Sequence, residues 1–265
     1  MIPLSPLDLA LAAALVLALA GLSAALGLGI GRGLLTAAAR AALQLALVGL
    51  VLKALFAARH PALVAAVAAF MLAVAGREVL ARQQVRLRGG WGLAASTLPI
   101  ALSTFAVTVL ALAVIIAPEP WYAPRYAVPL LGMLLGNAMN GVAIGLDRLH
   151  QGIRREAAVI EQRLALGEPW AEAVGGLRRE SVRAGMIPII NAMAAAGVVS
   201  LPGMMTGQIL AGAPPLEAVR YQLLILLLIA AASGLGTLGA VWIATRRLTD
   251  GRERLRLDRL TGPAP

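Results

Sequence analysis

Apolar residues run along most of the chain in long unbroken blocks, separated by short stretches rich in arginine, glycine and proline. Each block has about 20 residues or more, the length that an α-helix needs to cross about 30 Å of hydrocarbon. Because the blocks are continuous and do not alternate with polar residues, a transmembrane β-barrel is excluded. The pattern predicts an all-α, polytopic membrane protein with seven transmembrane helices, at about residues 7–30, 34–56, 61–80, 93–117, 127–147, 186–212 and 218–245.

The composition agrees with this fold class. Of the 265 residues, 60% are apolar and 14% are charged, whereas soluble domains are about 45–50% apolar and about 25% charged. The chain has no cysteine, which excludes a small secreted domain held by disulfides. No loop is long enough to fold alone, so we expect residues 1–265 to form a single transmembrane domain.

The basic residues predict the orientation. With the N-terminus outside, 19 of the 23 Lys and Arg residues lie on the cytoplasmic side, and four lie outside: Lys53, Arg59, Arg125 and Arg220. Cytoplasmic loops of membrane proteins carry such an excess, so we expect a cytoplasmic C-terminus in the cell inner membrane. Anionic lipids then account for the net charge of +10, and no nucleic acid is needed. The basic tail 246–265 is expected to be a short polar helix or a disordered end that faces solvent and lipid.

One cytoplasmic loop, residues 148–185, is much longer than the others. Its apolar residues recur at helical spacing on both sides of Gly167: Ala157, Ile160 and Leu164 before it, then Trp170, Val174 and Leu177. This pattern predicts an amphipathic helical hairpin between the fifth and sixth spans. An exposed apolar stripe should dock on lipid or on a protein, and the mixed charges of the loop favour a protein.

The spans lack the residues that catalysis and tight metal binding require. All thirteen acidic residues and both histidines lie in loops or at the ends of spans. We therefore expect no proton-coupling group and no high-affinity metal site inside the membrane. The phosphate-binding loop G-x-x-x-x-G-K-[ST] is also absent, since the only lysine, Lys53, lies within a span. We predict that the chain is not an enzyme and binds no cofactor, so that any ATP is bound by another subunit.

The fifth span carries small and polar residues on two adjacent stripes of its helix: Gly132, Gly136 and Asn140, and then Met133, Asn137, Gly141 and Gly145. Small residues at this spacing allow helices to pack closely in lipid. The two asparagines, Asn137 and Asn140, either bond to a neighbouring helix or line a translocation path, and the sequence leaves both interpretations open.

The sixth span contains a helix breaker at Pro202, followed directly by Gly203. Proline removes a backbone hydrogen bond, so this span should kink or unwind near its middle. Irregular backbone inside a membrane is tolerated where it is buried in protein or lines a cavity. We therefore interpret the break and its polar and sulfur-containing neighbours as part of a translocation path: Asn191, Met193, Ser200, Pro202, Met204, Met205 and Gln208. For the methionines, flexible core filling is the simpler interpretation.

Four segments resemble the FetB/YbbM family of ABC-transporter permeases: GMLLGNAMNG, E-x-x-L-A-L-G at 161–167, RAGMIPIINAMAAAGVVSLPGMMTGQILAG, and AVRYQ at 218–222. The resemblance is specific over about 130–225. It implies an iron export permease with plant relatives in aluminium tolerance, which works with a separate ATP-binding subunit.

The long loop is also similar to the EAA signature through which ABC permeases contact their ATPase. Glu161 and Gly167 keep the spacing of that signature, but Arg179 and Glu180 stand where it has Leu and Pro. The resemblance implies that the ATPase docks on a set of residues around the turn: Glu161, Leu164, Gly167, Pro169 and Trp170.

These observations lead to one hypothesis and an alternative. The chain is expected to be the permease subunit of an ABC transporter that exports iron or another metal-related solute. It would pair with a second copy of itself and with ATP-binding subunits. The alternative is an ATP-independent channel or membrane scaffold protein. A secondary transporter ranks third, for want of a titratable group within the membrane.

Overall fold

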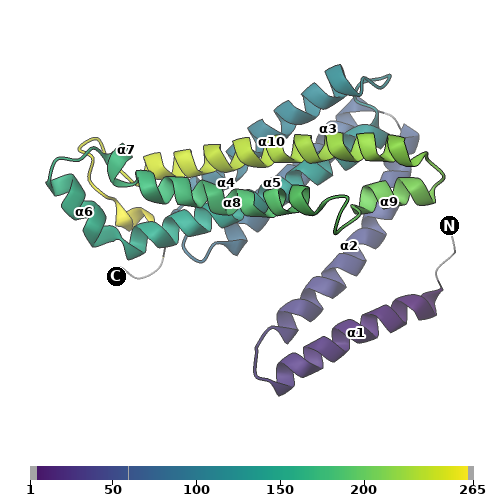
Figure 1. Ribbon diagram of the computed structural model, residues 1–265, viewed down its shortest axis with the longest axis horizontal. Helices are drawn as coiled ribbons and strands as arrows, with labels where there is room; N and C mark the ends of the chain where they lie inside the picture. Colours follow the sequence, from purple (N-terminus) through teal and green to yellow (C-terminus); the bar gives the residue numbers. More distant parts are fainter. Residues whose placement is uncertain (1–4, 59, 262–265) are drawn as a thin grey trace. The chain divides into compact units, whose positions relative to one another are not determined.

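A computed structural model of the protein describes residues 5–58 and 60–261 (Figure 1). Arg59 and the last four residues of the predicted basic tail lie outside the described residues. The helices are α1 (Pro6–Ala25), α2 (Gly31–Ala58), α3 (Pro61–Arg82), α4 (Gly90–Leu110) with a π-helical turn (Ala111–Ile115), α5 (Pro124–Arg155), α6 (Ala157–Ala165), α7 (Trp170–Ala173), α8 (Gly175–Ala195), α9 (Gly203–Leu210) and α10 (Pro215–Arg247). A short 3-10 helix (Leu257–Arg259) follows. The all-α prediction is confirmed for the described part of the chain.

Six helices within the described ranges are long and apolar enough to cross a membrane: α1, α2, α3, α4 with its π-helical turn, α5 and α10. Each coincides with one of the seven predicted spans. The remaining predicted span, 186–212, is divided between α8 and α9.

The break between α8 and α9 begins earlier than the sequence predicts. Helix α8 already ends at Ala195, and Pro202 is the N-cap of α9. Between them Gly197 has φ +80°, a left-handed conformation that favours glycine. The backbone N–H groups of Val199 and Ser200 both donate to the Ala195 carbonyl, at 3.0 and 3.1 Å. The predicted interruption is therefore present, but the left-handed turn at Gly197 precedes the proline.

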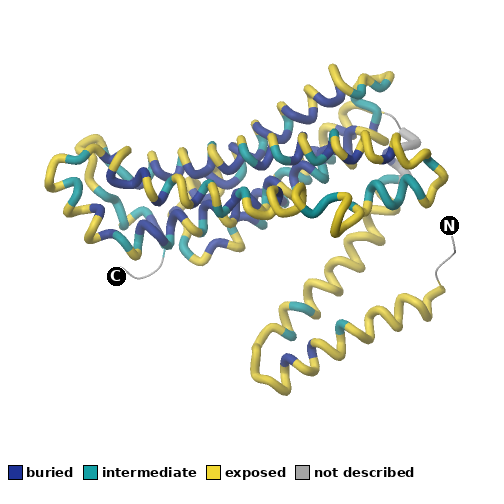
Figure 2. The backbone as a smooth tube through the Cα atoms, viewed as in Figure 1, coloured by how far each residue is buried: buried dark blue, intermediate teal, exposed yellow. Residues whose placement is uncertain are grey.

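The chain forms two compact units, residues 1–60 and 61–265. In the first unit α1 begins with a capping box. The backbone N–H of Ser5 donates to the Asp8 carboxylate at 2.7 Å, and the backbone N–H of Asp8 donates to the Ser5 hydroxyl oxygen at 3.3 Å. Helices α1 and α2 pack on each other. Figure 2 shows that most of their residues are exposed, and the exposed residues are mainly apolar. Such surfaces are stable in lipid or against another protein.

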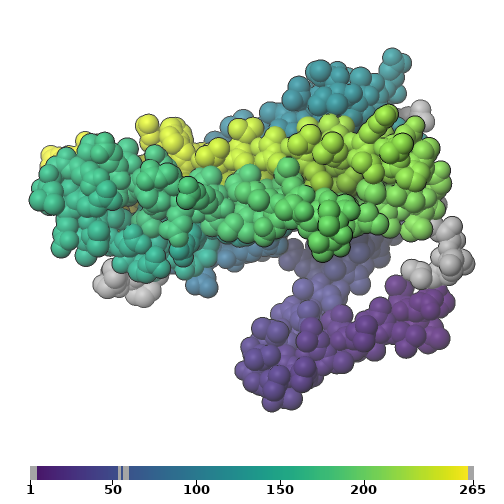
Figure 3. Space-filling view, viewed as in Figure 1, coloured from purple at the N-terminus to yellow at the C-terminus, as the bar shows by residue number. Residues whose placement is uncertain are grey.

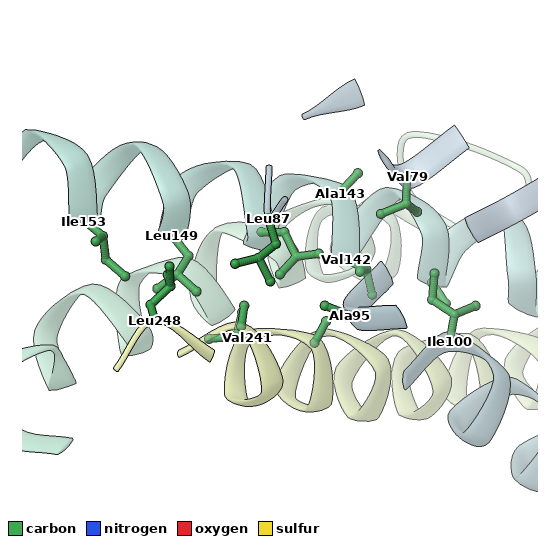
Figure 4. Close-up of a cluster of buried hydrophobic side chains, with 14 of the residues drawn as sticks. Val79, Leu87, Ala95, Ile100, Val142, Ala143, Leu149, Ile153, Val241 and Leu248 are labelled. Carbon is green, nitrogen blue, oxygen red and sulfur yellow. The ribbon is translucent and has the colours of Figure 1, made fainter. Parts of the chain in front are cut away.

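In the second unit α5 packs against α3, α4, α8 and α10. Its buried side chains share one core with those of α10, and Figure 4 shows Leu149 of α5 beside Leu248, the residue that follows α10. At the other end of this core Val79 of α3 and Ile100 of α4 lie beside α5. The helices that position the candidate sites therefore share one continuous core.

Small residues bring α5, α8 and α10 into close contact. A Cβ atom added to Gly185 of α8 would lie 2.5 Å from the Gly141 carbonyl oxygen and 2.7 Å from Cγ2 of Thr237. A Cβ on Gly145 would lie 2.9 Å from the same methyl group. The close-packing face predicted on the fifth span is thus confirmed at Gly141 and Gly145.

Residues 249–261 pack against the rest of the second unit, so the expectation of a disordered end is wrong for the described part of the tail. Leu248 and Leu260 are buried, and the backbone N–H of Arg88 donates to the Arg259 carbonyl at 2.8 Å. The backbone N–H of Thr261 donates to the Arg86 carbonyl, also at 2.8 Å. The tail therefore packs on the loop between α3 and α4 through its leucines. The many arginines of this segment make it look wholly polar in the sequence.

Candidate functional site

A cavity of about 320 Å³ lies between the C-terminal end of α3, the middle of α5 and Pro188 of α8. Its polar lining is Arg82, Asn140 and Asp147, and its apolar lining is Ala143, Ile144 and Pro188. The Arg82 guanidinium donates to the Asn140 side-chain oxygen, so Asn140 both bonds a neighbouring helix and lines the cavity. The interpretation that Asn140 bonds a neighbouring helix is confirmed, and its role in a translocation path stays a prediction.

Asp147 fixes the edge of this cavity. Its carboxylate accepts the backbone N–H of Gln84 at 2.9 Å and the side-chain amide of Gln151 at 2.7 Å. The guanidinium, amide and carboxylate give this otherwise apolar cavity a polar edge that can hold water. Arg82 and Asp147 carry opposite charges, so the lining has no net negative charge that would retain a bare cation. Among the described residues no three His, Cys, Asp or Glu side chains gather to hold a metal ion.

The other predicted path residues do not gather around this cavity. Asn137 is exposed on α5 and donates to the carbonyl of Met133 in its own helix, at 2.8 Å. On α8 and in the break, three of them are exposed: Asn191, Met193 and Ser200. From Pro202 into α9 four are half-buried: Pro202, Met204, Met205 and Gln208. Their role in a path stays a prediction.

The side chain of Gln208 differs from its neighbours in one respect. Its Oε1 atom is buried and accepts no hydrogen bond within the described part of the protein. An amide oxygen without a partner is costly in an apolar surrounding. The helix α9 that carries it packs on α10, so this oxygen marks a place where a further donor would stabilise the fold.

The long loop contains α6 and α7, which are joined by a turn at Gly167 and which we call the hairpin (Figure 1). Its place on the cytoplasmic side stays a prediction. Gly167 has φ +92°. Its N–H donates to the Leu164 carbonyl at 3.0 Å, and the N–H of Glu168 donates to the Arg163 carbonyl at 3.1 Å. This pair of bonds is the Schellman motif, which requires a left-handed residue such as glycine after the helix.

Arg163 holds the two arms of the hairpin together. Its guanidinium forms an ion pair with Glu168 across the turn and donates to the Ala173 carbonyl at 2.8 Å. One side chain therefore links α6, the turn and α7. The hairpin is a stiff element, not a flexible loop.

The apolar stripe of the hairpin packs inward. Ile160, Trp170 and Val174 are at most 6% exposed, in the same core as α5 and α10. The indole N–H of Trp170 donates to the Thr245 carbonyl at 3.2 Å, and its backbone N–H donates to Glu253 of the tail at 2.8 Å. The expectation that this stripe needs an outside partner is wrong, because α10 and the C-terminal segment cover it.

A different apolar residue is exposed at the tip of the hairpin, which we define as residues 164–169. Leu166 is 88% exposed, beside exposed Gly167 and Pro169. Of the predicted docking residues, Glu161 is also exposed, Leu164 is half-buried and Trp170 is buried. Leu166 was missed because it lies off the helical stripe, directly before the glycine where helical spacing stops.

A groove of about 630 Å³ runs between the tip and the C-terminal segment. Its lining combines both signs of charge, from Glu161 and Glu168 on the hairpin to Arg252, Glu253 and Arg254 on the tail. In Figure 3 the hairpin and the tail occupy the same end of the second unit. The tip and this groove together offer one apolar contact flanked by charged groups, an arrangement typical of a protein-binding surface.

A family model described as an uncharacterised protein family, UPF0014, matches residues 6–249 of the chain. A UPF0014 membrane protein of Synechocystis sp. is 39% identical over 226 residues, 84% of this chain and 85% of that protein. The "Probable iron export permease protein FetB" of Escherichia coli is 31% identical over 229 residues, 86% of each chain. Protein ALUMINUM SENSITIVE 3 of Arabidopsis thaliana is 29% identical over 204 residues, 77% of this chain and 72% of that protein. No solved structure matches the chain.

Proposed function

The chain belongs to the UPF0014 family of membrane proteins, and we propose that it is the permease subunit of an ABC transporter that exports iron or another metal-related solute. The resemblance to FetB and to a plant aluminium-related protein, expected from the motifs, is confirmed by these relatives. Iron as the substrate and an ATP-binding subunit as the partner are proposed for this chain from its resemblance to these relatives.

The observation that carries the proposal is the stiff hairpin with an exposed Leu166 at its tip. An ATP-binding subunit that moves during its cycle needs a rigid handle on the permease. Helix α5 leads into the hairpin at Arg155, and α8 leaves it at Gly175. Displacement of the tip would therefore act directly on the two helices that line the polar cavity.

The proposed topology has seven crossings, the N-terminus outside and the hairpin in the cytoplasm. The 32 residues of α5 extend over about 48 Å, more than the roughly 30 Å of hydrocarbon. Its C-terminal turns would carry the hairpin away from the bilayer, where an ATPase could reach it. The seventh crossing would be the broken pair α8 and α9, whose irregular backbone suits a site lined by protein or water.

Two further assignments follow from this proposal. The chain itself would bind no cofactor, with ATP held by the partner subunit. Seven spans are few for a complete alternating-access path, which favours a homodimer in the inner membrane. The exposed apolar surface of α1 and α2 is available for lipid or for such assembly.

The docking assignment is tested by Leu166→Asp. A charge at the only strongly exposed leucine of residues 164–169 should reduce co-purification with the ATP-binding subunit at least tenfold, because a central apolar contact dominates a small interface. The matched control is Val159→Asp on the same helix hairpin, where the side chain is 54% exposed away from the tip. Equal loss in both variants, or unchanged binding of Leu166→Asp, would refute the assignment.

A further inference from the structure

A second groove, of about 640 Å³, lies between α8 and α10 on the second unit. Its floor is apolar and comes from α10, mainly Leu235, Leu238 and Trp242, which recur at helical spacing. Each of these three side chains is more than half exposed. Figure 1 shows the two helices side by side over most of their length.

One end of this groove is strongly basic. Arg178, Arg179 and Arg183 of α8 line it, and no acidic residue does. Arg246 continues the same end, since its guanidinium stacks over the Trp242 ring at 4.8 Å. Within the described ranges the nearest acid on this helix, Glu180, is engaged by Arg148 of α5. The guanidinium groups are therefore available to an anion.

The apolar part of the groove can hold part of a lipid chain. From Leu235 to Trp242 the helical rise is about 10 Å, within the roughly 15 Å of hydrocarbon in one leaflet. Trp242 lies between the apolar and the basic parts, the position that tryptophan favours at a membrane interface. The groove thus has an apolar part, then the indole of Trp242, and then a basic end.

The positive charge at one end of the groove indicates which kind of molecule can occupy it. In a two-fold dimer through this face each cluster of arginines would approach its own copy, which costs free energy through like-charge repulsion. A phospholipid with a neutral head group would leave the guanidinium groups without a net counter-charge. An anionic phospholipid satisfies both parts of the groove.

We propose that this groove is a binding site for one anionic phospholipid of the inner leaflet, with its phosphate on Arg178, Arg179 and Arg183 and an acyl chain along Leu235 and Leu238. The inference rests on the proposed topology, which places the basic end at the cytoplasmic side. It does not depend on the ATPase, so failure of one assignment leaves the other open to its own test.

The test uses the full chain in phosphatidylcholine vesicles that contain either brominated phosphatidylglycerol or brominated phosphatidylcholine. Quenching at Trp242 is isolated as the difference between the wild type and Trp242→Phe. Brominated phosphatidylglycerol should quench at a several-fold lower mole fraction than brominated phosphatidylcholine. This preference should weaken in high salt, which screens the head-group attraction.

The triple variant R178Q/R179Q/R183Q should lose most of this several-fold preference, because basic residues at a membrane surface supply the attraction for anionic head groups. The matched control, R86Q/R88Q/R252Q, removes the same charge from exposed positions outside the groove and should keep it. Equal effects of the two triple variants would mean bulk attraction only and overturn the site. Weak quenching of wild-type Trp242 by every brominated lipid would also overturn it, because protein would then cover the groove. If the triple variant does not fold, the salt dependence and lipid preference of the wild type decide the question.

Discussion

At the scale of single residues, glycines determine how closely the membrane helices approach. Gly185 and Gly141 place the backbones of α8 and α5 in direct contact, with Thr237 of α10 beside them. In lipid, where no hydrophobic effect drives helices together, this van der Waals contact is a main source of stability. On α5 Gly141 lies at the level of the cavity residues Asn140 and Ala143, so a change at this contact should affect both stability and the proposed motion.

Gly185→Ala should destabilise the protein by about 1–3 kcal/mol, because the new methyl group would overlap a backbone carbonyl that cannot move aside freely. Thermal unfolding in detergent measures the loss as a lower Tm. The control is Gly176→Ala, an exposed glycine in the same helix whose added Cβ meets nothing within 4 Å. It should be neutral or raise the Tm. Equal Tm values for the two variants would contradict the close contact.

The tail provides a pH-dependent case at the same scale. Backbone N–H donation from Arg254, supported by its side chain, lowers the pKa of Asp250 to about 2. A lowered folded-state pKa stabilises the turn at every pH above the unfolded value of 3.8, and this contribution is lost as pH falls toward about 2. Hydrogen exchange of residues 248–256, corrected for intrinsic rates, should therefore keep its protection down to about pH 4 and lose it progressively between about pH 4 and 2. Loss of protection already between pH 5 and 4, or protection unchanged in Asp250→Asn, would contradict this role.

Sequence reasoning identified the kinds of residue at the candidate site better than their positions. Glu161 and Gly167 were found from spacing, and Gly167 has the left-handed conformation that the turn needs. Trp170 was expected to contact a partner because it belongs to the apolar stripe of the loop. The C-terminal tail was expected to be polar, so nothing in the sequence indicated that the tail covers this stripe. Leu166 was overlooked for the opposite reason, since its exposure depends on where the helix ends.

At the scale of elements, apolar periodicity predicted helices well and predicted their ends less well. Six predicted spans coincide with single apolar helices. The seventh was expected to break at Pro202, yet α8 ends at Ala195 because Gly197 turns the backbone first. Proline is a strong breaker in sequence, but a left-handed glycine is recognised only once φ is known.

The break itself can be measured, since the chain has no cysteine and labels can be placed freely. Spin labels at Ile190→Cys and Leu210→Cys, both exposed, report the distance across it. Pro202→Ala should leave that distance unchanged. Gly197→Ala strains a residue at φ +80°, so the distribution of label distances should extend toward the about 30 Å expected for a continuous helix. A changed distance in Pro202→Ala with an unchanged distance in Gly197→Ala would show that Pro202 causes the break.

At the scale of the whole molecule, composition and charge were sufficient for the class of protein. The long apolar blocks predicted a membrane protein, and family membership agrees. The packing of the tail on the hairpin and on the loop after α3 was beyond sequence reasoning. It depends on contacts between residues far apart in the chain, such as Trp170 with Glu253.

In the proposed mechanism the chain is a gate that a separate ATPase moves through its hairpin. The most direct measurement is ferrous iron flux in vesicles that contain the chain, with and without the reconstituted ATP-binding subunit. We expect uphill flux only when both subunits and ATP are present, and at least a tenfold loss with Leu166→Asp. Uphill flux by the chain alone, or full flux with Leu166→Asp, would contradict it.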